Sequence, residues 1–136
     1  MEQRVSFVTL VVADVPASRA FYVDGLGWDP EFEADDVLMF RVAEKVVLSL
    51  WSRAGFAGET GTEPVSGVPP ITLSHNVATP ETVDDVLTAV AAAGARVTAG
   101  EQRDWGGYSG YFRDPDGFNW EVCYNPGPIG QSVLPR

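Results

Sequence analysis

The sequence has few of the residues that build disulfides and zinc sites. Its 136 residues include one cysteine, Cys123, and one histidine, His75. A single cysteine cannot form a disulfide within the chain, and no group of cysteines and histidines exists for a zinc site. We therefore expect a protein of a reducing compartment, the cytoplasm.

Basic residues and long apolar runs are also scarce. Nine Lys and Arg stand against 19 Asp and Glu, a formal net charge of −10, which repels nucleic-acid phosphates and anionic lipids. The apolar stretch 5–12 stops at Asp14, too short for a membrane span and without a cleavage site. We expect no nucleic acid and no membrane as partners.

At 45% hydrophobic residues, the chain can bury the core of one domain, 1–136.

The first half of the chain predicts a strand, a helix and three more strands. Residues 5–12 are rich in β-branched and aromatic types, Asp14 can cap a helix, and Pro16 suits its first turn. The helix should end near Gly25 or Gly27. Three extended segments follow, at 28–35, 36–43 and 45–52.

Between the halves, residues 53–70 are dense in Gly, Pro, Ser and Thr and show no apolar period. This composition predicts an exposed linker rather than a packed element. We place module 1 at about 5–53, the linker at 54–69 and module 2 at about 70–126.

The second half repeats the same order. Residues 71–77 predict a strand, and Thr79 and Pro80 open a helix that Gly94 closes. Its apolar face is formed by Val83, Val86, Leu87 and Val90. Strands follow at 95–102, 108–114 and 118–125, with a turn at 114–117. The repeat predicts an α+β fold of two βαβββ modules whose sheets curl around a cavity.

Two stretches resemble a known family: VTLVVADVPASRAFYVDGLGW near the front and GGYSGYFRDPDGFNWEVCYNP near the back. With the paired βαβββ order, they are similar to the vicinal oxygen chelate superfamily of glyoxalase I, bleomycin-resistance proteins and extradiol dioxygenases. The resemblance implies a cup-shaped mixed sheet around a central cavity, and often a homodimer whose modules complete the pockets.

Metal-dependent members of that family carry four ligands, and the resemblance places them on Phe7, near Leu48 (where Leu50 is also aliphatic), on Thr72 and on Glu121. Phenyl and aliphatic side chains offer no donor atom, so only Glu121 is a good ligand. A shift of three residues would substitute His75 for Thr72. We expect no cofactor and no complete metal site; the alternative is a divalent ion on Glu121 and His75.

Strand alternation predicts which side chains face the cavity. The expected ligand-binding residues are Phe7, Thr9, Thr72, Ser74, Asn76 and Glu121, together with Trp105, Tyr108 and Tyr111, whose neighbouring glycines leave their rings free to stack on a flat ligand. The alternatives are a water-filled cleft at the polar positions and a core-rim role for Trp105 and Tyr108. By the same alternation His75 points to the helix side as a hydrogen-bonded structural residue, unless the register slips by one and makes it a base or ligand.

Glu121 is the candidate catalytic residue. If it is buried, it needs an elevated pKa or a partner such as Arg103, Arg113 or a tyrosine hydroxyl. Cys123 lies two residues after Glu121, so strand alternation places both on the same face. We expect a buried, inert thiol there.

Two functions follow from these residues. The favoured one is binding of a small organic, aromatic ligand without a complete metal site, as in the bleomycin-resistance branch. The alternative is a lyase, isomerase or dioxygenase of the glyoxalase type, with Glu121 as metal ligand or acid/base.

Overall fold

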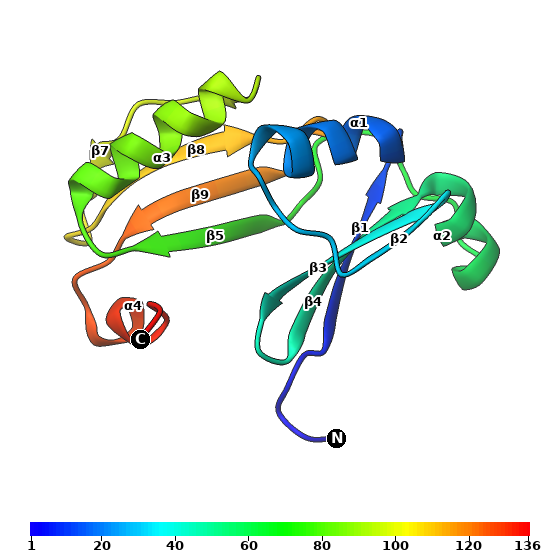
Figure 1. Cartoon of the computed structure of the whole chain (residues 1–136). Helices are drawn as coiled ribbons and strands as arrows, with labels where there is room; N and C mark the ends of the chain where they lie inside the picture. Colours follow the sequence, from blue (N-terminus) through cyan, green and yellow to red (C-terminus); the bar gives the residue numbers. More distant parts are fainter. The chain divides into compact units, whose positions relative to one another are not determined.

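Strand β1 opens the first of two units, Met1–Gly67 and Val68–Arg136, in a computed structural model that describes residues Met1–Arg136 (Figure 1). The elements of unit 1 are β1 (Phe7–Val12), α1 (Val15–Arg19), η1 (Ala20–Gly25), β2 (Phe32–Ala34), β3 (Val37–Ala43), β4 (Val46–Ser52) and α2 (Arg53–Thr60). Its sheet has the strand order β1-β4-β3-β2, in which β1 and β4 are parallel and the other pairs antiparallel.

The helical segment of unit 1 begins and ends where the sequence predicts. Asp14 caps α1, its side chain accepting a hydrogen bond from the Ala17 amide. The chain turns out of η1 at Gly27, whose φ of +73° suits a residue without Cβ. Tyr22 of η1 is fully buried, with its ring 5.7 Å from that of Phe40 on β3. The α1–η1 segment therefore covers one face of the unit 1 sheet.

The expected linker is partly helical. Arg53–Thr60 form α2, a helix that was not predicted within this exposed segment. The signals are local: the Ser52 side chain accepts a hydrogen bond from the Gly55 amide at 3.0 Å, and Gly61 ends the helix with a φ of +70°. No residue of α2 is buried, which explains why the apolar period is missing.

Unit 2 repeats the order of unit 1. Its elements are β5 (Thr72–Val77), α3 (Pro80–Ala92), β6 (Arg96–Val97), β7 (Glu101–Gln102), β8 (Tyr108–Arg113), β9 (Asn119–Tyr124) and α4 (Pro128–Ser132). The sheet has the order β5-β9-β8-β6, with β7 also paired to β8, and β5 and β9 are parallel. The α+β class and the two βαβββ modules are thus confirmed, whereas α4 was not predicted.

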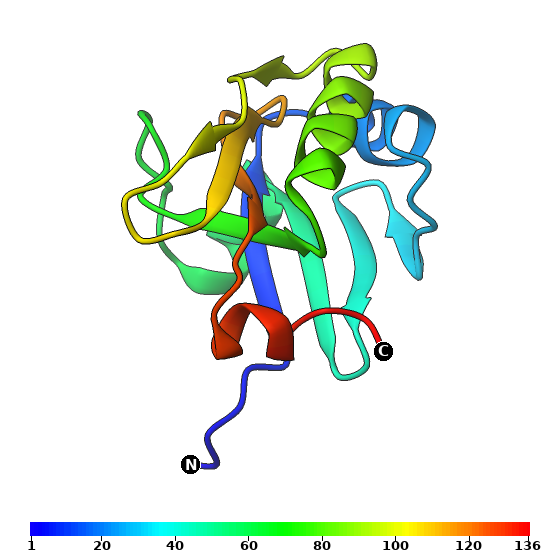
Figure 2. The same cartoon turned by 90° about the vertical axis from the view of Figure 1, so that its left-hand side faces the viewer.

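Helix α3 lies along one face of this sheet (Figures 1 and 2). Thr79 caps it, accepting a hydrogen bond from the Thr82 amide at 3.2 Å. Three of the four predicted apolar-face residues are buried, Val83, Leu87 and Val90. Gly110 of β8 lets the helix approach closely, because a Cβ there would lie 2.5 Å from Leu87 Cδ1. Because Gly110 has no side chain, α3 can pack close to β8.

The strand predicted at 95–102 is split. Val97 and Glu101 are four positions apart, whereas their partners Phe112 and Ser109 on β8 are three positions apart, so one extra residue bulges out. At the bulge, the hydroxyl of Thr98 accepts a hydrogen bond from the Tyr111 amide at 2.9 Å, in place of a backbone carbonyl.

No helix in either unit has the length and apolar content that crossing a bilayer requires.

Candidate functional site

The unit 2 sheet has an open face, opposite α3. Val122 and Trp120 are buried on the α3 side, so the residues that alternate with them on β9 point to the open face. Strand pairing extends that face across the sheet. Its residues are Thr72, Ser74 and Asn76 on β5, Asn119, Glu121 and Cys123 on β9, Ser109, Tyr111 and Arg113 on β8, and Arg96 on β6.

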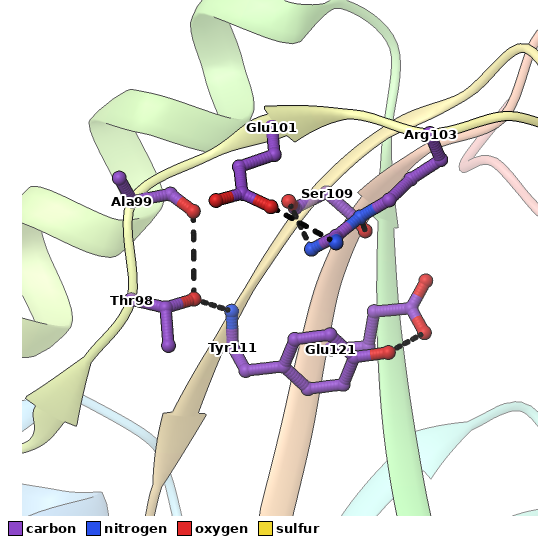
Figure 3. A network of polar contacts seen from close by, with 7 residues as sticks. All are labelled: Thr98, Ala99, Glu101, Arg103, Ser109, Tyr111 and Glu121. Carbon is purple, nitrogen blue, oxygen red and sulfur yellow. Dashed lines mark hydrogen bonds and ion pairs between the residues drawn. The ribbon is translucent and has the colours of Figure 1, made fainter.

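Glu121 lies at the centre of this face, paired in register with Ser74 on one side and Tyr111 on the other. The Tyr111 hydroxyl donates a hydrogen bond to Glu121 Oε2 at 2.9 Å (Figure 3). A tyrosine hydroxyl was one of the partners expected for this carboxylate, and that expectation is confirmed. Partial burial, together with the hydrogen bond to Glu121, raises the pKa of Tyr111, so its hydroxyl is the proton donor of the pair.

Arg103 extends the cluster beyond Tyr111. Its Nε donates to Ser109 Oγ and its Nη2 to the Ser109 carbonyl, both at 2.9 Å, and its Nη1 contacts Glu101 Oε2 at 3.3 Å. The guanidinium carbon lies 5.8 Å from the centre of the Tyr111 ring, within cation–π range. Three anchoring contacts thus hold a positive charge over the ring that contacts Glu121, as Figure 3 shows.

The sequence placed Arg103 among the partners of Glu121 but missed this arrangement. The available signal was the Gly106-Gly107 pair after Arg103, which makes a tight hairpin: the Arg103 amide donates to the Gly107 carbonyl at 2.7 Å. That hairpin turns the chain back so that Ser109 meets the arginine side chain.

Cys123 lies on the same face but is closed to solvent, at 4% exposure. Burial, followed by the neighbouring Glu121 carboxylate, raises the pKa of its thiol to about 12. Because the thiolate is the nucleophilic form, this cysteine is held in its unreactive state at neutral pH.

The structure brings together five of the nine predicted ligand-binding residues, Thr72, Ser74, Asn76, Tyr111 and Glu121. Tyr108 lies on the opposite, α3-covered face, where its hydroxyl donates to Asp84 Oδ1 at 2.9 Å and this bond raises its pKa. Trp105 is 55% exposed in the hairpin, with its indole over the backbone of Gly107. Tyr108 was expected to bind the ligand as Tyr111 does, but it lies on the other face, because the two differ by an odd number of strand positions.

His75 points to the α3 side, as strand alternation predicts, in register with buried Val122. Desolvation lowers the pKa of its imidazole, although the residue as a whole is exposed. Its ring forms no side-chain hydrogen bond, so the expected hydrogen-bonded partner is absent. His75 and Glu121 occupy opposite faces of one sheet, which separates the two residues named as an alternative metal pair.

In unit 1, Phe7 and Thr9 share the face opposite the α1–η1 segment, and both are exposed. Leu48 lies on the opposite, buried face of this sheet, where Tyr22 also packs. It pairs in register with Val8 and Phe40, and it is 2% exposed. Register instead places Ser49 beside Thr9. Leu48 therefore points away from the face that Phe7 and Thr9 share.

The donor atoms of these positions do not fit the four-ligand metal site of the family. Phe7 has no donor, Ser49 and Thr72 offer only neutral hydroxyls, and Glu121 contributes a single carboxylate. Nowhere in the chain do three or more His, Cys, Asp or Glu side chains gather as a group that could hold a metal ion.

Comparison with known proteins gives a consistent result. The family model described as Glyoxalase/Bleomycin resistance protein/Dioxygenase superfamily matches residues 4–122. No match was found among curated proteins.

Solved structures share the fold. A glyoxalase-related enzyme from Fulvimarina pelagi is 31% identical, with a TM-score of 0.85, and the alignment covers 92% of this chain and 90% of that one. A glyoxalase/bleomycin resistance protein/dioxygenase from Nocardioides is 22% identical, with a TM-score of 0.79 and coverage of 93% and 89%. A lactoylglutathione lyase from Agrobacterium tumefaciens is 21% identical, with a TM-score of 0.73 and coverage of 91% and 95%. At the last two identities, the likeness concerns the fold alone.

Proposed function

The chain belongs to the glyoxalase/bleomycin resistance protein/dioxygenase superfamily, and we propose that it binds a small organic, aromatic ligand on the open face of unit 2. The observation that carries this proposal is the cluster of Tyr111, Glu121 and Arg103. Tyr111 offers a half-buried ring to a flat ligand, and Glu121 offers a carboxylate as acceptor.

Polar residues of β5 flank this cluster and support the same proposal. Thr72, Ser74 and Asn76 add two hydroxyls and an amide along the strand that pairs with β9. A ring with a few convergent polar groups is the usual composition of a small-molecule site. Thr72 and Ser74 are exposed, so their hydrogen-bonding groups are available to a ligand.

We further propose that this ligand is bound without a complete metal site. The proposal rests on the side chains at the four family ligand positions. Only Glu121 supplies a charged donor there, and the other positions have neutral hydroxyls or hydrocarbon groups. The resemblance also predicts a homodimer, and the single cysteine favours a cytoplasmic location. Light scattering of the purified protein and fractionation of its host cell would test these two predictions.

A screen of melting temperature with two arms tests the binding proposal. We expect a panel of aromatic compounds to contain members that raise the melting temperature by mass action, whereas Zn²⁺, Ni²⁺, Mn²⁺ and Fe²⁺ leave it unchanged. Glu121→Gln should abolish the ligand shift, and Glu63→Gln, at an exposed position of unit 1 after α2, is the matched control. Stoichiometric metal in elemental analysis, lost on Glu121→Gln, would contradict the metal-free proposal.

One observation favours the catalytic alternative. The Tyr111 hydroxyl donates to a Glu121 carboxylate oxygen at 2.9 Å, which holds a proton donor beside a proton acceptor. We infer that, if a reaction occurs, Glu121 is the base and Tyr111 positions it. Turnover of a ligand found in the screen, lost in Glu121→Gln and retained in Glu63→Gln, would support an enzyme; binding without turnover would leave a binding protein.

A further inference from the structure

Two arginines lie directly opposite each other on β6 and β8 without an acidic partner. Arg96 pairs in register with Arg113, and neither belongs to an ion pair. The ion-paired arginines of the chain are Arg4, Arg19, Arg41 and Arg103. Like charges placed opposite each other destabilise an antiparallel pair, so the unit keeps a costly positive site in a chain of net charge −10.

A pocket of about 360 Å³ lies at this pair. It is lined by Arg96, Val97, Thr98, Tyr111, Phe112, Arg113 and Asn119. Its volume is within the range of small-molecule sites. Arg113 Nε donates to Asn119 Oδ1 at 3.3 Å, which orients the guanidinium and leaves its Nη groups available to a ligand. Two guanidinium groups beside one pocket are the usual recognition chemistry for carboxylate and phosphate oxygens.

The pocket adjoins the Tyr111–Glu121 pair. Arg113 and Asn119 are opposite each other on the open face, and each lies two residues along its strand from Tyr111 and Glu121. Two residues of a strand span about 7 Å, the length of one aromatic ring with its substituent. Because Tyr111 itself lines the pocket, one small molecule can contact both groups.

We propose that the ligand of this face is an organic anion whose carboxylate or phosphate group binds between Arg96 and Arg113. This inference rests on the proposed binding function and specifies its ligand class. The charge distribution orients the molecule: the anionic end lies at the arginines, and the uncharged end extends over Tyr111 toward Glu121, whose carboxylate would repel a second anion.

Four probes test the proposal by amide NMR titration of the full chain at constant ionic strength: benzoate, phenyl phosphate, uncharged benzamide and inorganic phosphate. We expect benzoate or phenyl phosphate to bind about tenfold more tightly than benzamide. A charge-assisted hydrogen bond to an arginine strengthens binding by about that factor or more, and benzamide has no charge to form one. Comparing the first two probes distinguishes a carboxylate ligand from a phosphate ligand. Amide shifts should centre on residues 96–98 and 111–113.

The double variant Arg96→Gln/Arg113→Gln should lose that preference, and Arg4→Gln/Arg136→Gln, which removes the same charge elsewhere, should keep it. Single Arg96→Gln and Arg113→Gln variants replace the double variant if it does not fold. Retained anion affinity in the arginine variants, or an equal loss in the control, would overturn the proposal.

The probes separate this inference from the function on which it rests. Binding of benzamide as tight as that of benzoate, lost in Glu121→Gln but not in the arginine variants, would leave the aromatic site standing and overturn the anion site. Shifts with inorganic phosphate alone would support the anion site and overturn the aromatic one. No shift with any probe would overturn both.

Discussion

The Tyr111 hydroxyl donates a hydrogen bond to Oε2 of Glu121, the residue directly opposite it on the neighbouring strand, at 2.9 Å. The pairing satisfies a carboxylate that would otherwise be costly on a half-buried face. It also fixes the ring that Arg103 faces from the other side. Disturbing either residue should therefore alter the other.

Tyr111→Phe removes the hydroxyl and leaves the ring. We expect a loss of about 1.5–2 kcal/mol in unfolding free energy, the lower end of the usual range for a hydrogen bond to a charged group, and weaker binding of any ligand that contacts Glu121. Urea unfolding and ligand titration measure the two effects. Tyr124→Phe, whose hydroxyl forms no side-chain hydrogen bond, is the matched control. Equal losses in both variants would mean that the Glu121 bond contributes nothing.

The turn between β8 and β9 gives a second prediction. Asp114 is 5% exposed, and its Oδ1 accepts from the amides of Asp116 and Phe118, both at 3.0 Å. Asp114→Ala leaves these donors without their acceptor, so we expect a loss of about 2–3 kcal/mol in unfolding free energy. Asp114→Asn keeps an acceptor oxygen and should lose less. Exposed Asp104→Ala should stay within about 0.5 kcal/mol of wild type, and a comparable loss there would contradict the argument.

That turn was predictable because its signals are local. Asp, Pro and Gly stand in the order that a type I turn requires, and the Gly117 amide donates to the Asp114 carbonyl at 3.0 Å. The caps at Asp14 and Thr79 were recognised for the same reason. Local side-chain chemistry thus predicted both βαβββ modules.

The site was harder to predict, because it depends on register between distant strands. Alternation placed Glu121, Ser74 and His75 correctly, since each lies within one regular strand. Tyr108 and Leu48 lie on the helix-covered faces of their sheets, away from the other candidate residues. A slip of one residue reverses a side chain, and only the pairing partners fix it. The facing arginines at 96 and 113 were missed for the same reason, since a bulge separates them from the rest of the predicted strand.

Close packing of α3 on β8 gives a third prediction. A Cβ on Gly110 would lie 2.5 Å from Leu87 Cδ1 and 3.1 Å from the Ala99 carbonyl oxygen. Gly110→Ala should therefore cost about 1–3 kcal/mol, the usual penalty for overpacking. Gly58→Ala is the control, because a Cβ there meets nothing within 4 Å and an alanine in helix α2 should stabilise by up to about 1 kcal/mol. Urea midpoints that fall for both variants would contradict this account.

Reactivity of the single thiol gives a fourth prediction. Cys123 is buried and the pKa of its thiol is raised to about 12, so almost no thiolate is present at pH 8. We expect Ellman's reagent to modify the folded protein far more slowly than the urea-unfolded protein, in which the thiol has its ordinary pKa. Since the chain has no other cysteine, the absorbance reports this residue alone. Equal rates in both states would show that the thiol is accessible and ionised in the fold.

The lowered pKa of His75 makes stability depend on pH. Desolvation disfavours the imidazolium in the folded state, so the unfolded chain binds the proton more strongly. The stabilising contribution is therefore fully present above the unfolded pKa of about 6.5 and is lost as pH falls through the folded value. Between pH 7.5 and 5.5, His75→Gln should lose less unfolding free energy than wild type, measured by urea unfolding at each pH. A wild-type curve that is flat over this interval, or one that falls equally in the variant, would show that His75 is not the group responsible.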